Sequence, residues 1–284
     1  MIERSRVQHA SENDVSKNTA TAVSAILITR NEAQNLPDCL AGLAWCDEIV
    51  VLDSGSTDET IEIARRAGAR VHTSSDWPGF GPQKNRVLAL ARCDWILSVD
   101  ADERVTPSLA AEIRATISGA SPCDAYAMAR LSSYCGQFMR HGGWYPDRVV
   151  RLFRRGKAQF SDDIVHESVQ TQGGVGRLRE DLLHISYRSF EDVLDKMNRY
   201  STAGAHKAAS RGRSSSLLSA WLHSRWAFVR AYFLRLGVLD GRLGYVLACS
   251  IAHETWYRYV KLWSLPRESL NTCTLETPPR PERR

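Results

Sequence analysis

Features that mark secreted, membrane-spanning or zinc-bound proteins are missing from this chain. No apolar signal segment opens it, and its longest apolar stretch, residues 244–252, falls well short of the ~20 residues that a bilayer-spanning helix needs. The seven cysteines form no Cys-x-x-Cys pair, and their number is odd. We therefore expect reduced cysteines in a cytosolic protein, without a disulfide framework or a zinc site.

The chain also lacks internal repeats, long low-complexity runs and a strong charge of one sign. Its formal net charge is +5 over 284 residues, and the excess lies late, between Arg199 and Arg242. Such a region suits an anionic partner such as phospholipid or a phosphorylated saccharide. Nucleic acid would match the charge as well, but no recognised binding module accompanies it, so we expect no nucleic-acid partner.

What is present is an alternation of strand and helix patterns over the first 118 residues. Apolar runs that end at Thr29, Asp53 and Asp100 are typical of buried strands, and helical segments follow them. Ser56 and Glu59 are spaced as a capping box, which predicts a helix from Ser56 to Gly68. This alternation predicts a mainly parallel α/β sheet.

The pattern changes after residue 118. Short alternating segments, separated by turn signals, predict a smaller mixed sheet that extends the first. Ser189 then caps a long amphipathic helix, and residues 217–263 are helical, aromatic and basic. These boundaries predict a disordered leader, two sheet-forming regions, a helical region and a disordered tail, at residues 1–21, 22–118, 119–188, 189–265 and 266–284.

Carboxylates stand at the ends of two predicted strands. Asp100 and Asp102 follow one strand, with a single residue between them, and Asp53 ends another. Ligands of parallel sheets bind outside the carboxyl ends of the strands. Mg²⁺ takes one or two carboxylates together with substrate phosphates, so this arrangement indicates a nucleotide-diphosphate site. A turn or helix-cap role is the alternative for both Asp53 and Asp100.

Three segments at these strand ends resemble the N-terminal motifs of glycosyltransferase family 2: Ile28-Thr29-Arg30-Asn31-Glu32, residues 51–60, and Val99-Asp100-Ala101-Asp102-Glu103. Further segments, at residues 79–85, 141–147, 151–156, 165–167 and 198–201, resemble the branch that contains lipopolysaccharide-core β-1,4-glucosyltransferases. The resemblance runs from about Ser24 to Trp263. It implies a GT-A (Rossmann-like) fold, with a mixed, mainly parallel sheet flanked by helices and a C-terminal helical extension.

The resemblance also implies an activity. We expect a metal-dependent inverting transfer of a sugar, glucose first, from a UDP-linked donor to a lipopolysaccharide-core or other envelope glycolipid. Residues 22–118 would bind the nucleotide sugar and residues 119–188 the acceptor. The cofactor would be Mg²⁺ or Mn²⁺. Residues 189–265 would place the protein on an anionic membrane surface, at the cytoplasmic face of the inner membrane.

The resemblance assigns donor-side roles to residues near the strand ends. Asp102 would be the direct metal ligand, and Asp100 would face the ribose or a metal-bound water. Asp53 would bind the nucleobase, and Lys84 would supply a cation near base or phosphate. Thr29 and Glu32 would line the base pocket, although Glu32 is also a favourable first-turn acid for a helix.

The catalytic base must be a carboxylate within hydrogen-bond distance of the acceptor hydroxyl. We expect Glu167, with Asp147 as the second choice among Asp147, Asp162, Asp163 and Glu167; a surface salt bridge is the alternative. His166 would orient Glu167 or contact donor phosphate. His141 and Trp144 belong to a glycine-containing loop that offers an aromatic platform, although Trp144 also fits a core position. One side of an arginine stripe that includes Arg151 would face the diphosphate or a phosphorylated acceptor.

Two other functions stay open at this stage. A nucleotidyltransferase also uses strand-end acids, but the chain has Arg30-Asn31-Glu32 where such enzymes have a glycine-rich basic loop. A catalytically inactive membrane-surface binding protein would not need Asp53, Asp100, Asp102 and Glu167 together.

A zinc site of His141, His166 and His184 lacks ligand spacing. The C-terminal aromatic residues also fit helices that pack on the catalytic domain instead of a membrane.

Overall fold

The computed structural model describes residues 21–119, 122–162 and 168–265, and they form two units. The first unit consists of the chain up to Asp100, Ala111–Tyr126 and Val150–Gly176. The second consists of Ala101–Ala110, Ala127–Val149 and the chain from Arg177 onwards. The boundaries predicted at residues 118 and 188 stay predictions.

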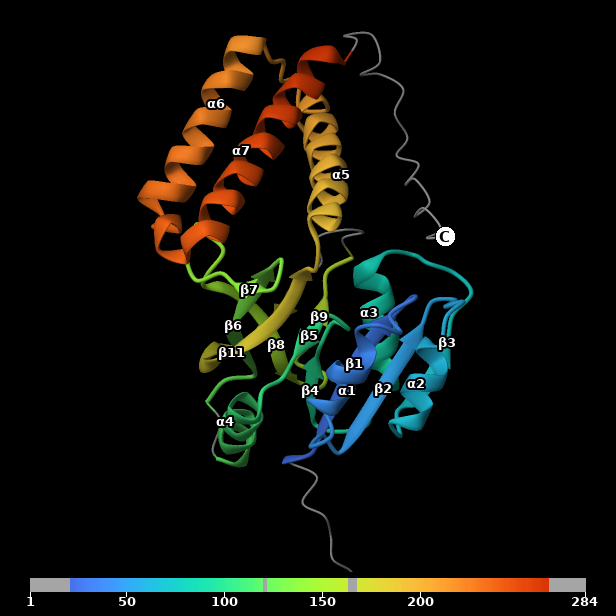
Figure 1. Ribbon diagram of the computed structural model, residues 1–284. Coiled ribbons are helices and arrows are strands. Elements are labelled where there is room, and N and C mark those ends of the chain that lie inside the picture. The colour runs from blue at the N-terminus through green and yellow to red at the C-terminus, as the bar shows by residue number, and fades with distance from the viewer. Residues whose placement is uncertain (1–20, 120–121, 163–167, 266–284) are drawn as a thin grey trace, which may run out of the picture. The chain divides into compact units, whose positions relative to one another are not determined.

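The first unit is built on a sheet whose neighbouring strands follow the order β3-β2-β1-β4-β8 (Figure 1). Their bounds are β1 Val23–Thr29, β2 Glu48–Asp53, β3 Arg70–Thr73, β4 Trp95–Ser98 and β8 Asp147–Arg154. β1 to β4 are parallel, whereas β8 runs antiparallel to β4. The strands of the parallel part therefore carry their carboxyl ends to one edge.

Helices cover this parallel sheet because each presents an apolar side to it. They are α1 Leu36–Ala41, α2 Thr60–Arg66 and α3 Phe80–Leu90. α3 packs on β1 and β2, where its Val87 joins a core with Ile26, Val50 and Ile96. A two-stranded ribbon, β9 Ala158–Phe160 and β10 Val169–Thr171, adds Phe160 to the same core. Alternating strand and helix thus bury one continuous apolar layer.

The second unit combines antiparallel strands with a helical region. The strands are β5 Glu103–Arg104, β6 Ala125–Tyr134, β7 Gln137–Phe138 and β11 Val175–Tyr187, with β6 beside β11 and β5 on the other side of β11. α4 Pro107–Ser118, like β6, β8 and β11, has residues in both units. Cross-strand register places His184 of β11 opposite Glu103 of β5.

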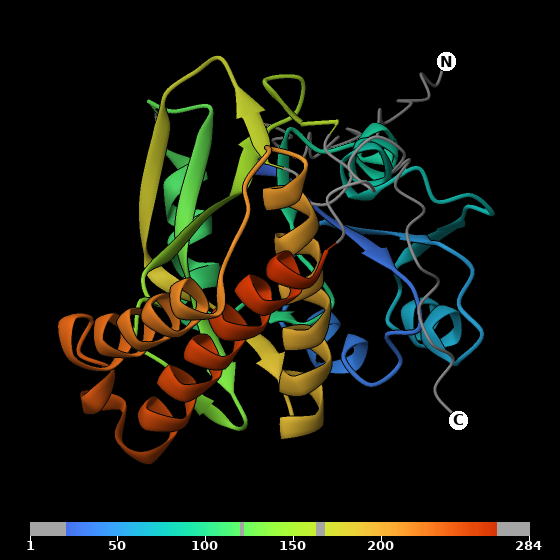
Figure 2. The same cartoon turned by 90° about the horizontal axis from the view of Figure 1, so that it is seen from above.

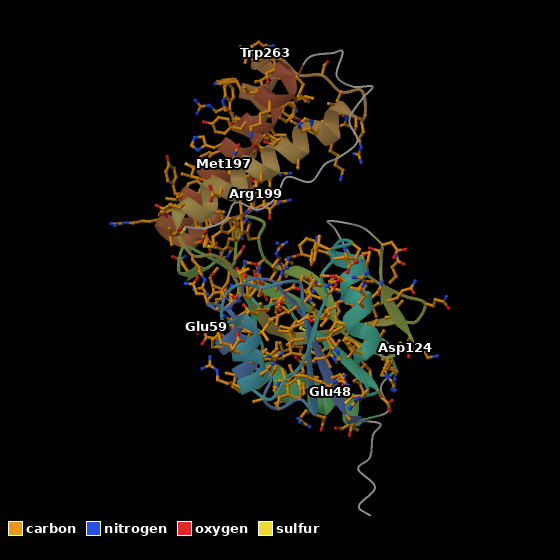
Figure 3. The ribbon with its side chains drawn as sticks, turned by 90° about the vertical axis from the view of Figure 1, so that its right-hand side faces the viewer. Glu48, Glu59, Asp124, Met197, Arg199 and Trp263 are labelled. Carbon is orange, nitrogen blue, oxygen red and sulfur yellow. The ribbon has the colours of Figure 1, made fainter. Side chains whose placement is uncertain are left out.

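The helical region consists of α5 Phe190–Ala209, α6 Leu217–Val229, the π-helical turn η2 Arg230–Leu234, the 3-10 turn η3 Gly237–Asp240, and α7 Gly241–Ser264. α7 lies between α5 and α6 and packs against both (Figures 1 and 2). Met197 and Arg199 lie on α5, and Trp263 lies near the end of α7 (Figure 3). Met197 packs with Leu247 of α7, which joins these two helices.

The observed elements confirm the expected mixed α/β fold and C-terminal helical extension, with two local corrections. Ser56 does not cap α2, which begins four residues later at Thr60, because the Ser56 hydroxyl binds Asp53 instead. The fourth strand ends at Ser98, two residues before Asp100. Ser189 does cap α5, and its Oγ accepts a hydrogen bond from the backbone N–H of Asp192. Among the described helices, none combines the length and the apolarity that crossing a bilayer requires.

Candidate active site

The strand order of the first unit has a reversal between β1 and β4. The chain adds β2 and β3 on one side of β1 and then places β4 on the other side. In open α/β sheets, ligands bind at such a switch point, outside the carboxyl ends of the strands. Thr29 ends β1 here, Asp53 ends β2, and Asp100 follows β4. The fold therefore brings these three predicted residues of the first unit to one sheet edge.

Asp53 organises the turn after β2. Its buried carboxylate accepts hydrogen bonds from the Thr29 hydroxyl at 3.0 Å and from the backbone N–H groups of Gly55 and Ser56 at 3.0 and 2.8 Å. The Ser56 hydroxyl also binds it and accepts from the backbone N–H of Asn31 at 2.8 Å. Thr29 and Asp53 thus contact each other, and hydrogen bonds join the carboxyl ends of β1 and β2.

Glu32 lies in the loop that follows β1, and a hydrogen bond from its backbone N–H holds it there. Its N–H donates to the Thr60 hydroxyl at 2.8 Å, and its Oε2 accepts from the side chain of Asn35 at 2.8 Å. Asn31, with a positive φ of 55°, accepts from the N–H of Thr57 through Oδ1 at 2.8 Å. These bonds tie the loop after β1 to the loop after β2.

Asp100 lies between two buried cations. Its Oδ1 is 2.8 Å from Nζ of Lys84, which comes from α3, and its Oδ2 contacts a guanidinium nitrogen of Arg151 from β8. Lys84 is 3% and Arg151 6% exposed. Burial alone would raise the pKa of the Asp100 carboxyl, but Arg151 and Lys84 outweigh it and hold this pKa well below its usual range. Asp100 therefore contacts two buried basic side chains of the first unit, one from α3 and one from β8.

The four arginines of the stripe, Arg148, Arg151, Arg154 and Arg155, have different surroundings, and strand parity does not sort them, because Arg155 lies beyond the end of β8 and is exposed. Arg151 points into the fold, whereas Arg148 is exposed. Arg154 lies over the ring of Trp95, 4.5 Å from its centroid, and Arg155 is 3.9 Å from Asp94. Of these four arginines, Arg151 is the one placed on Asp100.

In the second unit, Asp102 faces a histidine. Its Oδ2 is 3.3 Å from Nε2 of His184, on β11. The other ring nitrogen, Nδ1, lies 2.9 Å from the hydroxyl of Ser132 on β6. The backbone carbonyl of Asp102 also accepts from the N–H of Ile185 at 2.8 Å, which holds the loop against β11. Ser132, His184 and Asp102 therefore form a hydrogen-bonded row.

This row suits a divalent cation. A carboxylate oxygen and an imidazole Nε2 are common ligands for such ions, and a histidine ligand usually has its other nitrogen held by a second group, as Ser132 holds Nδ1. Within the described residues, no group of three or more histidine, cysteine or acidic side chains gathers for a metal. Asp102 and His184 would supply two protein ligands, and Mg²⁺ commonly takes its remaining ligands from substrate phosphates and water.

Asp147, the second choice for the base, is engaged in an ion pair. Its Oδ2 accepts from Nε and Nη2 of Arg130, at 2.9 and 2.6 Å. Arg130 also lies 3.7 Å from the buried Glu103. The first choice, Glu167, and its neighbour His166 lie outside the described residues. The identity of the base therefore stays a prediction.

His141 and Trp144 are close in sequence but have different surroundings. Nδ1 of His141 is 2.8 Å from Oδ1 of Asp240, whose Oδ2 accepts the His141 N–H at 2.8 Å. Trp144 is partly buried and packs against Tyr134 and Tyr187, with ring centroids 5.6 Å apart in each pair. Its ring joins an aromatic cluster, and its role as a sugar platform stays a prediction.

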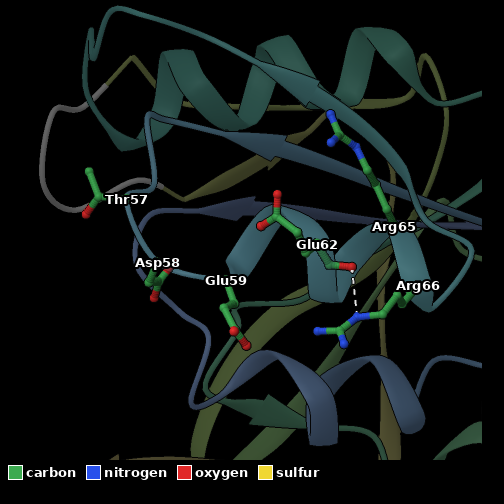
Figure 4. A pocket seen from close by; sticks show the side chains of 6 residues that line it. All are labelled: Thr57, Asp58, Glu59, Glu62, Arg65 and Arg66. Atoms are coloured by element: carbon green, nitrogen blue, oxygen red, sulfur yellow. Dashed lines mark hydrogen bonds between the residues drawn. The ribbon is translucent and has the colours of Figure 1, made fainter.

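A pocket of about 660 Å³ at the start of α2 is separate from these residues (Figure 4). Side chains of both signs line it: Thr57, Asp58, Glu59, Glu62, Arg65 and Arg66. None of the residues expected to bind the donor or the metal is among them. Asp58 instead accepts hydrogen bonds from Thr60 and from the N–H of Ala33, so it holds the start of the helix. We do not assign this pocket to the active site.

His184 and Ser132 are the two residues that sequence reasoning missed in these roles. The sequence pattern suggests His184 only as one of three histidines of a zinc site, and those three lack the spacing of zinc ligands. Its position opposite Glu103 depends on the register between β11 and β5. A single sequence does not state strand register, so nothing in the local pattern around His184 could have placed it beside Asp102.

Comparison with known proteins identifies the family of the chain. Residues 24–179 match the family model described as "Glycosyl transferase family 2". An uncharacterized glycosyltransferase of Rickettsia felis is 30% identical over 87% of this chain and 90% of its own length. The lipopolysaccharide core biosynthesis glycosyltransferase LpsC of Rhizobium meliloti is 28% identical over 84% of this chain and 93% of its own length.

Among solved structures, residues 1–349 of TarS from S. aureus match with 17% identity and a TM-score of 0.46, over 87% of this chain and 90% of that one. The family model covers more than half of the 284 residues. The chain therefore belongs to glycosyltransferase family 2 and is a glycosyltransferase.

Proposed function

We propose that this protein is a metal-dependent inverting glycosyltransferase. It moves a hexose, with glucose as the first candidate, from a UDP-linked donor to a lipopolysaccharide-core or other envelope glycolipid. The observation that carries the proposal is the Asp100 carboxylate between Lys84 and Arg151 at the switch point of the sheet. The name of the relative LpsC supports the choice of acceptor.

The donor side of the proposal rests on charge. Lys84 and Arg151 stabilise the negative charge that develops on the leaving diphosphate, because they are buried and held in place before the reaction. Thr29, Glu32 and Asp53 belong to the bonded loops that would surround the nucleobase. Asp100 positions both cations and faces the ribose.

Asp102 and His184 would hold Mg²⁺ or Mn²⁺, with Asp100 as the further candidate. A bound divalent ion supplies positive charge that stabilises the departing phosphate oxygens. Ser132 keeps Nδ1 of His184 engaged, which leaves Nε2 directed at the Asp102 carboxylate. Asp102 and His184 thereby fix where the positive charge of a bound ion would lie.

The reaction is a single displacement. The acceptor hydroxyl oxygen forms a bond to the anomeric carbon, while the bond from that carbon to the diphosphate oxygen breaks. A carboxylate takes the hydroxyl proton. We propose Glu167 for this role, with Asp147 second, His166 as its orienting neighbour, and His141 and Trp144 on the acceptor side.

The acceptor would be lipid-linked, so we place the protein peripherally on the cytoplasmic face of the inner membrane. Exposed apolar and basic residues of the helical region support this placement. The predicted organisation goes with it: residues 22–118 for the donor, 119–188 for the acceptor and 189–265 for the membrane.

The test is a product assay with the purified full-length chain. UDP-glucose, and then other nucleotide sugars, are incubated with Mn²⁺ or Mg²⁺ and a lipopolysaccharide-core acceptor, and the released nucleotide is identified. Free UDP with loss of signal in EDTA is expected. Asp102→Asn should reduce the rate by at least about 100-fold, since it weakens metal binding. Asp195→Asn, an exposed change on α5, is the matched control.

Two outcomes would contradict the proposal. Pyrophosphate as the released product would indicate a nucleotidyltransferase instead. Absence of metal-dependent binding with every nucleotide sugar, measured by calorimetry, would indicate an inactive surface-binding protein.

A further inference from the structure

The outward side of α6 carries large apolar side chains that no other described element covers. Leu218, Leu222 and Trp226 are 68%, 51% and 56% exposed. The same side continues through the π-helical turn, and together the residues form what we call the docking stripe: Leu218, Trp221, Leu222, Trp226, Val229 and Phe233. Contiguous apolar patches of this kind mark interaction surfaces.

The opposite side of α6 explains why the stripe faces away from the unit. Ala220 and Ala227 are buried, and the hydroxyl of Ser224 donates to the backbone carbonyl of Ala252 on α7 at 2.9 Å. The ring of His223 stacks on Tyr259 of α7, with centroids 4.2 Å apart. Small and polar residues, with the ring of Phe228 against Tyr245 at 5.8 Å between centroids, thus pack α6 on α7, and the residues of the docking stripe are left outside.

The charge around the stripe is positive. Between residues 211 and 253 there are six arginines and a single acid, Asp240, which is buried and bonded to His141. Arg225 lies within the stripe, 5.5 Å from the ring centroid of Trp221, and Arg230 flanks it. In the described part of the chain, neither arginine lies within salt-bridge distance of a carboxylate.

A pocket of about 400 Å³ lies where α6 turns toward α7, and Arg140, Tyr145, Arg235 and Leu236 contribute to its lining. Arg235 lies directly over Gly143, where a Cβ atom would overlap its guanidinium. Leu234 and Leu236 are exposed on either side of Arg235. Arg235 thus offers a cation near two exposed apolar side chains, and a phosphate headgroup with its acyl chains needs this combination.

We infer that the docking stripe lies on an anionic phospholipid surface, with Arg225, Arg230 and Arg235 on the lipid phosphates. Tryptophan and leucine on one side with arginine beside them are typical of helices that lie in the membrane interface. A second copy of the chain fits less well. The docking stripe and its flanking arginines include no acid, so the same surface of a second copy could not neutralise Arg225 and Arg230.

This inference deepens the proposed function by naming the surface that meets the membrane, and it rests on that function for the choice of a bilayer. Its test contains neither donor nor acceptor, so a protein that fails to transfer sugar can still pass it. The full chain is floated on a density gradient with vesicles of phosphatidylcholine alone, and with vesicles that contain about one-third phosphatidylglycerol.

The wild-type chain should float with the anionic vesicles, weakly with the neutral ones, and less in high salt. The double change Leu222→Gln and Trp226→Gln should weaken binding at least about tenfold. Arg225→Gln should weaken it about fivefold. The matched control pair, Leu194→Gln and Tyr200→Gln, removes equally exposed apolar residues of α5 and should bind as the wild type does.

Circular dichroism checks that each variant is folded. Vesicles of lipids with brominated chains give a second measurement, because they can be used with the wild-type chain. They should quench tryptophan fluorescence in the wild type, and Trp221→Phe with Trp226→Phe should abolish that quenching. Equal binding to both vesicle types, or full binding by the Leu222 and Trp226 double variant, would overturn the inference. So would a lipid-free dimer that this variant converts to a monomer, because a second copy would then cover the stripe.

Discussion

Asp100 shows how a single ionised side chain links stability to pH in this protein. Its carboxyl has a lower pKa in the folded protein than in the unfolded chain, where about 3.9 is usual. The ionised form therefore stabilises the fold above about pH 4, and this contribution is lost as the pH falls toward the folded-state pKa.

We expect Asp100→Asn to lower the free energy of unfolding by about 3 kcal/mol at pH 7, because Lys84 and Arg151 stay buried without this carboxylate. The gap between variant and wild type should narrow below about pH 4. Urea denaturation at pH 7 and pH 3 measures both values. Asp76→Asn, which breaks an exposed pair with Arg86, is the control and should change little. A variant as stable as the wild type at pH 7 would contradict this account.

Ser132 offers a second test at the residue scale, with a readout apart from activity. Ser132→Ala removes the group that holds Nδ1 of His184, so it should weaken Mn²⁺ binding by about 10- to 100-fold. Isothermal titration calorimetry measures the affinity. Ser133→Ala is the matched control, because neighbouring strand residues point to opposite faces. Unchanged affinity in Ser132→Ala would show that the bond from Ser132 to His184 does not support metal binding.

At the scale of elements, α5 depends on its first residue. Ser189→Ala removes the acceptor for the Asp192 N–H and should cost about 1 kcal/mol of stability. Ser189→Asp keeps an acceptor at the cap and should preserve stability. Thermal unfolding of the three proteins measures the difference. Equal melting temperatures for Ser189→Ala and the wild type would show that the cap contributes nothing.

The elements also show what the sequence could predict. Apolar runs predicted β1 and β2, and the serine before an amphipathic segment predicted the cap at Ser189. All three depend on neighbours along the chain. The expected cap at Ser56 was wrong because Asp53 binds that hydroxyl, a contact set by the turn. Lys84, Asp100 and Arg151 were predicted separately, but their meeting depends on how α3, β4 and β8 assemble. Contacts between elements that are distant in the sequence cannot be predicted from the periodicity of each element.

At the scale of the whole molecule, ligand binding should appear as stability. A ligand that binds only the folded state stabilises it by about 2.7 kcal/mol at 100 times its Kd. UDP with Mn²⁺ should therefore raise the melting temperature of the full chain, and EDTA should reverse most of the shift. Thermal-shift measurements with UDP, GDP and CDP would rank the bases. Equal shifts for all three would contradict a uracil-selective site.

The turn that carries His141 is fastened to the helical hairpin at several points. The Gly142 N–H donates to the carbonyl of Arg235 at 2.9 Å, Asp240 holds His141, and Arg235 fills the space over Gly143. These contacts join the turn that carries His141 to the segment between α6 and α7. A displacement of Arg235 or Asp240 would therefore break the hydrogen bonds that hold Gly142 and His141 in place.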